Sequence, residues 1–329
     1  MGGLTFVLNV RLDAACDASP WLRDRRIHGK RVDMGEAKRR KRLSCICGSG
    51  QPAGQCCWTA HGYHRKPVVV DLHDTGLTGK HDRCYMAATG ACDTKISGEH
   101  LISHSVLKIL ADKQVELSGM PWQKSGEKKM LPFGSLITNC LCRRHNSLLS
   151  PIDVVGARLF EAIQKCGTTD TGPGLLFLLS GHDVERWMLR SLAILGVSGN
   201  FAIDGAVIDQ NFVERLRIVE LLEDVTQWKK PVGFYLTRGL GHQFLRRDNM
   251  QIAPVVKTGG DDIVGITLDL QGLEFALLVA DHDVTGTGLD KALYRPGALV
   301  FRMGETAHRI QFSWEDGLPH EDVISTWKK

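Results

Sequence analysis

The sequence has no run of about 18 apolar residues, so a membrane-spanning helix is not expected. It also has no internal repeat and no low-complexity tract, which excludes solenoid and fibrous architectures. The apolar stretch at 4–10 is short and lacks a basic flank, so we do not expect a secretory signal. These absences predict a cytoplasmic protein. With 329 residues, 43% of them hydrophobic, the chain is long enough for two domains plus extensions.

Charge is distributed unevenly along the chain. The formal net charge of +4 is the difference between +10 in residues 1–150 and −6 in residues 151–329. A basic N-terminal half suits a polyanionic partner such as nucleic acid. A solvated basic tail is the alternative, and charge alone favours neither.

The ten cysteines are strongly clustered. Eight of them fall between positions 45 and 142, mostly in close pairs. In a cytoplasmic chain, clustered cysteines indicate zinc binding rather than disulfides.

The first cluster begins Cys-Ile-Cys-Gly-Ser-Gly at Cys45, and eight residues separate Cys47 from the pair Cys56 and Cys57. This pattern closely resembles the SEC-C zinc motif. Four thiolates complete a closed tetrahedral zinc site, and the glycines permit a tight turn between the ligand pairs. The expected role is binding to a protein or to nucleic acid, since a closed site leaves no position for catalysis. An unliganded or redox-active cluster is the alternative.

Two further stretches, forty residues apart, look like halves of one metal-dependent site. In the first, Glu99 precedes His100, so a metal ligand and a general base can lie side by side. In the second, Cys142 and His145 form half of a zinc knuckle, and Asn146 follows directly with an amide oxygen. Together they resemble the HNH (ββα-metal) endonucleases, in the branch with Glu-His first and Cys-x2-Cys-Asn second. The resemblance covers about residues 84–151.

The resemblance implies a mechanism for hydrolysing phosphodiester bonds in DNA. His100 would activate water, because its ordinary pKa near 6.5 suits a base at neutral pH. Glu99 and Asn146 would hold a catalytic Mg²⁺ or Mn²⁺ ion, which would stabilise charge at the leaving 3′-oxygen. The product would carry a 5′-phosphate. Because side chains alternate along a strand, we expect Glu99 and His100 at a strand end or turn.

A structural zinc would hold this segment together, through Cys84, Cys92, Cys142 and His145. Seven residues separate Cys84 from Cys92, where the family usually has two, so Cys140 could replace either one. The chain would then hold two structural zinc ions.

Nucleic acid, DNA in preference to RNA, is the expected partner. The candidate phosphate contacts are Arg143, Arg144, Lys128 and Lys129, the lysines belonging to an insertion between the two halves of the site. His104 lies four residues after His100 and is a candidate partner in the site, with a surface position as the alternative.

The predicted fold class is α+β: small zinc-stabilised N-terminal modules, followed by helices packed on an antiparallel sheet. We expect helices starting at Ser150-Pro151, between Ser180 and Gly196, and over 211–223. Strands are expected at 232–237, 263–270, 273–280, 298–303 and 308–314. The predicted organisation is a basic extension at 1–44, the SEC-C motif at 45–58, a linker at 59–80, the nuclease-like module at 81–151 and an α+β domain at 152–329. Met34 is a candidate true start, which would leave 1–33 untranslated.

Two other functions remain open at this stage. The chain could be a zinc-binding adaptor that binds nucleic acid or an acidic protein without cutting. Alternatively, the C-terminal domain could carry the activity, with the zinc modules serving only to deliver it. A role in defence against foreign DNA, or in a mobile element, is compatible with the nuclease hypothesis.

Overall fold

The computed structural model of the chain describes residues 8–11, 34–73, 76, 78–169, 171–203, 206–207, 212–236, 243–244, 249–257, 262–280, 289 and 292–327. Most of the predicted N-terminal extension therefore lies outside the described residues. The helices are α1 (Met34–Arg42), α2 (Ala53–Cys56), α3 (His104–Leu110), α4 (Arg143–Thr168), α5 (Gly181–Val197), α6 (Phe212–Arg215) and α7 (Ile218–Glu223).

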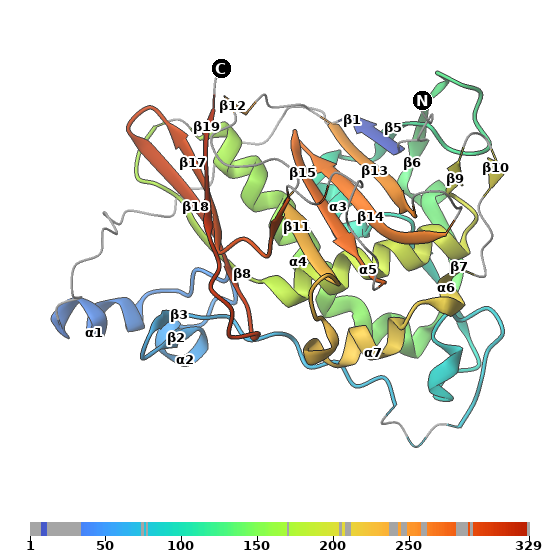
Figure 1. Cartoon of the computed structure of the whole chain (residues 1–329), viewed down its shortest axis with the longest axis horizontal. Helices are drawn as coiled ribbons and strands as arrows, with labels where there is room; N and C mark the ends of the chain where they lie inside the picture. Colours follow the sequence, from blue (N-terminus) through green and yellow to red (C-terminus); the bar gives the residue numbers. More distant parts are fainter. Residues whose placement is uncertain are drawn as a thin grey trace.

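Most of the strands belong to two sheets. The larger sheet has the order β16-β11-β15-β14-β13-β1-β5-β6, and all of its neighbouring strands are antiparallel; they are β1 (Leu8–Arg11), β5 (Gln114–Ser118), β6 (Lys128–Pro132), β11 (Gly233–Leu236), β13 (Asn249–Val256), β14 (Ile263–Leu270), β15 (Leu273–Leu278) and β16 (Leu293–Tyr294). The smaller sheet has the order β12-β19-β17-β18-β8; its strands are β8 (Leu176–Ser180), β12 (Gln243–Phe244), β17 (Ala298–Met303), β18 (Thr306–Ser313) and β19 (Asp322–Trp327). Figure 1 shows the smaller sheet at the left, beside the blue N-terminal module, and the larger sheet at the right.

Three short strand pairs complete the described structure: β2 (Trp58–Thr59) with β3 (Gly62–Tyr63), β9 (Ala202–Ile203) with β10 (Ala206–Val207), and β4 (Ile96–His100) with β7 (Ile137–Cys142). The last pair leads directly into α4. The α+β class is confirmed, with small cysteine-bearing modules ahead of the helices and sheets.

Helix α5 is the centre of the molecule. Apart from Ser191 and the final Val197, all of its side chains are buried. The helix contacts α4, α6 and α7 as well as strands of both large sheets. Its predicted start is confirmed, because the Ser180 hydroxyl accepts a hydrogen bond from the Asp183 amide at 3.2 Å.

The predicted helix start at Ser150-Pro151 is wrong. Helix α4 begins at Arg143 and runs through Pro151 without interruption. A proline inside a helix leaves the carbonyl four residues earlier without its partner. Here the Ser150 hydroxyl donates to the Ser147 carbonyl at 2.9 Å, which compensates for the missing amide. The predicted division between residues 151 and 152 therefore falls inside one helix.

The strand predictions for the C-terminal half are confirmed at β11, β14, β15, β17 and β18. The smaller sheet is mixed, however, because β8 runs parallel to β18, and β19 runs parallel to β17 and β12. The single helix predicted over 211–223 is two short helices, α6 and α7, separated at residues 216–217. None of the helices in the described ranges is long and apolar enough to span a membrane.

Candidate functional site

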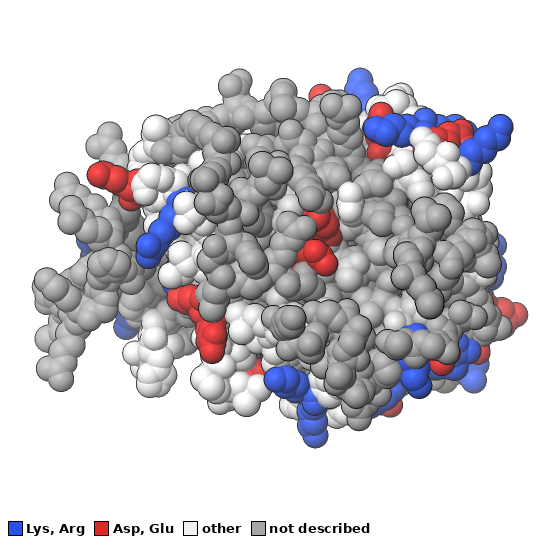
Figure 2. All heavy atoms as spheres, turned by 45° about the horizontal axis from the view of Figure 1, so that its top comes forward, with Lys and Arg blue, Asp and Glu red and all other residues white. Residues whose placement is uncertain are grey.

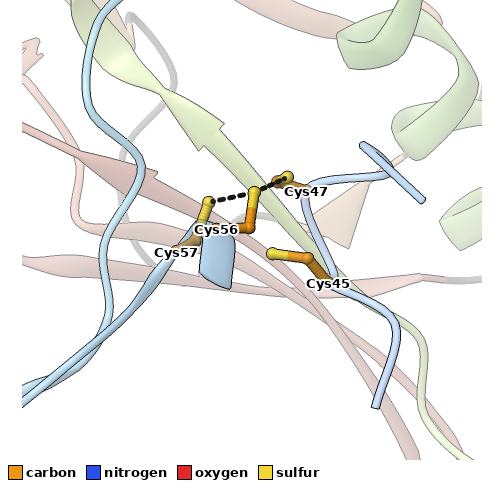
Figure 3. A group of neighbouring side chains, drawn as sticks. All are labelled: Cys45, Cys47, Cys56 and Cys57. Carbon is orange, nitrogen blue, oxygen red and sulfur yellow. Dashed lines mark hydrogen bonds between the residues drawn. The ribbon is translucent and has the colours of Figure 1, made fainter. Parts of the chain in front are cut away.

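The four cysteines of the first cluster converge as predicted. Cys45 and Cys47 lie in the loop after α1, whereas Cys56 and Cys57 lie at the end of α2, and the four sulfur atoms are all within 4.8 Å of one another. Figure 3 shows the sulfurs pointing toward a common centre. The Cys56 sulfur lies 3.4 Å from that of Cys47 and 3.5 Å from that of Cys57. These four thiols fit one tetrahedral zinc ion.

Local groups favour a thiolate in this cluster. Burial opposes ionisation, but hydrogen bonds from Ser49 and from neighbouring thiols lower the pKa of Cys47 to about 6. Burial raises the pKa of Cys45 to about 11. The Arg65 guanidinium donates to the Cys47 sulfur at 2.8 Å, so it places positive charge beside the ligand set.

The second cluster contains Cys84, Cys92, Cys142 and His145, with all four ligand atoms within 4.8 Å of one another. The Nδ1 atom of His145 lies 3.5, 3.8 and 3.2 Å from the sulfurs of Cys84, Cys92 and Cys142, in that order. Cys140 is not a member of this group. The structure therefore supports the originally predicted ligand set over either replacement by Cys140.

His145 presents its Nδ1 atom to the three thiols. Burial and the nearby Arg144 lower its pKa to about 4, so the imidazole is neutral. Nδ1 faces the thiols, while Nε2 lies 3.2 Å from the Thr89 hydroxyl and accepts from Nη1 of Arg144 at 3.0 Å. Thr89 in turn donates to the Met86 carbonyl at 2.9 Å. These contacts fix the orientation of the imidazole ring relative to the three thiols.

The cluster lies where β7 meets α4, and β4, β7 and α4 form a ββα unit. Strand β4 carries Glu99 and His100 at its C-terminal end, β7 lies antiparallel to it, and α4 carries Asn146 in its first turn. The register shifts between Ser97 and Glu99, so that Asn139 and Cys140 of β7 oppose Gly98 alone, as in a bulge. Glu99 and His100 thus lie at a strand end, as predicted.

The two side chains have different environments. Glu99 is 4% exposed, whereas His100 is half-buried and stacks on the exposed His104, with ring centroids 4.7 Å apart. Burial and the charge of His104 lower the pKa of His100 below its ordinary value. His100 is therefore unprotonated at neutral pH, the state that a general base needs.

Glu99 and Asn146 do come together, but around an arginine. Nη2 of Arg190, from α5, lies 2.7 Å from Glu99 Oε1 and donates to Asn146 Oδ1 at 3.2 Å. Burial raises the pKa of Glu99, and Arg190 opposes that effect. A carboxylate and an amide oxygen are donors that fit Mg²⁺ or Mn²⁺. In this structure the Arg190 guanidinium already contacts both of these oxygens.

The predicted phosphate contacts divide into two groups. Arg143, Lys128 and Lys129 are exposed, although Lys128 pairs with Glu116 at 3.0 Å. Arg144 donates to the backbone carbonyls of Leu72 and Ala91, at 2.8 and 3.0 Å, which gives it a structural role. On the face drawn in Figure 2, the described Lys and Arg side chains form separate groups, some beside acidic residues, rather than one basic band.

Sequence reasoning missed Arg190 and its third partner, Asp153 of α4. A signal was present, because α5 carries several charged residues among apolar ones on every side, and a charge buried in such a helix must be paired. The partner in β4 could not be identified, since it lies about ninety residues away in the sequence.

Comparison of this chain with protein-family models, with curated proteins and with solved structures finds no match. The structure shows two cysteine-rich groups whose ligand atoms lie close enough together to hold a metal ion each. It does not assign the chain to a family.

Proposed function

We propose that this protein is a cytoplasmic HNH-type endonuclease that hydrolyses phosphodiester bonds in DNA, with a role in defence or in a mobile element. The observation that carries the proposal is the β4–β7–α4 unit. Its Cys3His group fastens α4 to the β7 end, so that Asn146, Glu99 and His100 belong to one rigid unit. A fixed geometry of this kind is what positioned acid–base chemistry requires.

In this proposal, the neutral imidazole of His100 takes a proton from the attacking water. The stacked His104 restrains the His100 ring and disfavours its protonation. Glu99 and Asn146 would hold a Mg²⁺ or Mn²⁺ ion, which stabilises the negative charge that develops at the leaving oxygen. Exposed Arg143, at the start of α4, is available to a backbone phosphate.

The test uses supercoiled plasmid, the zinc-loaded full chain, and Mg²⁺ or Mn²⁺ against EDTA. We expect metal-dependent nicking or linearisation that His100→Ala abolishes without changing zinc content. His61→Ala is the control, because His61 is exposed in the β2–β3 turn, in a different module. Cleavage that persists in His100→Ala at the native rate would refute the assigned base.

A zinc-binding adaptor is the second candidate. It is favoured by the closure of both clusters, which have four ligands each, and by the burial of Glu99 against Arg190. Such an adaptor would bind nucleic acid in a salt-sensitive way, or a protein through the four-cysteine module or the C-terminal half. Nucleic-acid binding without cleavage under any metal condition would favour it over the nuclease.

A further inference from the structure

One guanidinium gathers three oxygen donors in the buried part of the ββα unit. Arg190 contacts Glu99 and Asn146 through Nη2, and Asp153 through Nη1. The donors come from the end of β4, the first turn of α4 and a later turn of the same helix. Arg190 is 1% exposed, and its own helix, α5, lies outside the ββα unit.

The charges at this position do not balance. The carboxylates of Glu99, which is buried, and Asp153, whose side chain is 20% exposed, face a single guanidinium, so the group as a whole carries excess negative charge. A divalent cation would neutralise both carboxylates. Two carboxylate oxygens and one amide oxygen are also the hard donors that Mg²⁺ and Mn²⁺ prefer.

The hold of Arg190 on the site is incomplete. Its Nε atom is buried and has no hydrogen-bond partner among the described residues. An unpaired buried donor is unfavourable, because it has lost its hydration without gaining a hydrogen bond. The two Nη atoms of the guanidinium therefore make ionic contacts, while its Nε atom is buried without a partner. The unpaired Nε reduces the free energy lost when a metal ion replaces the guanidinium.

We propose that Arg190 and a divalent cation are alternative occupants of one site, formed by Glu99, Asn146 and Asp153. The guanidinium fills the site in the metal-free protein, and the ion enters only when the guanidinium leaves. Asp153 is then a third oxygen ligand, and Arg190 is a positioning residue that sets the affinity for the ion. This inference deepens the proposed nuclease function, on which the catalytic use of the ion rests.

The test measures Mn²⁺ binding to the zinc-loaded full chain, by electron paramagnetic resonance of free Mn²⁺, without any nucleic acid. Arg190→Gln should bind Mn²⁺ at least tenfold more tightly than the native chain, because the competing cation is gone. Adding Glu99→Gln or Asp153→Asn to that variant should abolish the gain.

Arg186→Gln is the matched control. Arg186 lies one turn earlier in the same helix, is similarly buried at 2% exposure, and pairs with Asp183 instead of with the site. Its replacement should leave Mn²⁺ affinity unchanged. An equal gain in both variants, or a gain that survives Glu99→Gln, would overturn the proposal.

Folding is controlled separately, since Arg190→Gln leaves the buried Glu99 carboxylate without its cation and leaves Asp153 with only the Ser103 hydroxyl. Millimolar Mn²⁺ should rescue its stability, and failure to fold even with Mn²⁺ counts against exchange. Arg190→Lys keeps a charge but cannot span three oxygens, so we expect a smaller gain in affinity; no gain in this variant also contradicts exchange. Mn²⁺ binding with this dependence but without DNA cleavage would refute the nuclease alone. Cleavage with unaltered Mn²⁺ affinity would refute the exchange alone.

Discussion

The described cysteines divide into candidate zinc ligands and thiols that are buried away from either group. Among the described residues, seven cysteines lie in the two groups, while Cys140 and Cys166 are buried thiols outside them. Burial raises the pKa of Cys140 to about 12, which suits a neutral thiol in the core rather than a metal ligand. Position in space, and not sequence proximity to Cys142, therefore decides which thiols can bind zinc.

Zinc content tests this division. The native chain should contain two zinc ions per molecule by elemental analysis, and Cys142→Ser should contain one. Since a structural zinc contributes roughly 10–16 kcal/mol to the folding of small motifs, Cys142→Ser should also unfold the ββα unit. Cys140→Ala, two residues earlier in the same strand, should keep both ions. Loss of zinc from Cys140→Ala would contradict the assigned ligand set.

His308 gives a pH prediction far from either cluster. It is fully buried, accepts from the Leu175 amide at 3.0 Å and donates to the Thr169 carbonyl at 2.7 Å. Burial lowers its pKa, so the unfolded chain binds this proton more readily, and the stability that neutral His308 contributes is lost as pH falls below about 6.5. Urea unfolding should therefore show the stability advantage of the native chain over His308→Gln shrinking from pH 7.5 to 5.5. A constant difference would show that His308 does not titrate in this way.

Among the elements, those with a regular pattern were predictable and those set by distant contacts were not. Alternation identified β14, and the Ser180 cap identified α5. The start of α4 was misread because Pro151 follows Ser150, a pattern typical of a helix N-terminus, while the helix begins at Arg143, directly after Cys142. Strand β8 was missed because its short apolar run carries no period of two, and its parallel partner β18 lies far along the chain.

The four-cysteine module makes specific contacts with the rest of the chain. Arg158 of α4 donates to the Ile46 carbonyl at 2.8 Å, and the Arg65 amide donates to the Ser313 hydroxyl of β18 at 2.9 Å. Leu178 of β8 packs in the same small core as three of the cysteines. The module is therefore docked on α4 and the smaller sheet.

Two glycines in the turn of the four-cysteine module provide a matched test of its docking. Gly48 and Gly50 both have left-handed backbone conformations, with φ of +74° and +75°, so alanine costs about 1–2 kcal/mol at either position. Only at Gly48 would a Cβ collide with Arg158, at 1.5 Å from Nη1, whereas nothing lies within 4 Å at Gly50. Gly48→Ala should thus lower the thermal stability more and make the module more sensitive to limited proteolysis, with zinc content unchanged in both variants. Equal effects would mean that the docking contact does not stabilise the chain.

Across the whole molecule, one continuous apolar core extends from the ββα unit through α5 into both large sheets. The C-terminal half thereby supplies the ββα unit with a packing partner, as well as with Arg190. This contact could not be predicted from the sequence, because the α5 residues that make it pair with residues of β4 and α4 that lie far away along the chain. Composition showed that a large core could form, but not that a single helix would be its centre.

The crossing of α4 and α5 tests how strongly the two halves depend on each other. A Cβ on Gly156 of α4 would lie 2.3 Å from Nε1 of Trp187, which itself donates to the Ser103 hydroxyl at 3.3 Å. In an ordinary helix interior, Gly→Ala stabilises by about 1 kcal/mol. Here overpacking, at about 1–3 kcal/mol, should outweigh that gain, so Gly156→Ala should lower the free energy of unfolding in urea and alter the tryptophan fluorescence. Val154→Ala, at a 62% exposed position of the same helix, should change it by less than about 0.5 kcal/mol. If Gly156→Ala stabilised the chain instead, the two helices would not be in the close contact on which both the ββα unit and the Arg190 site depend.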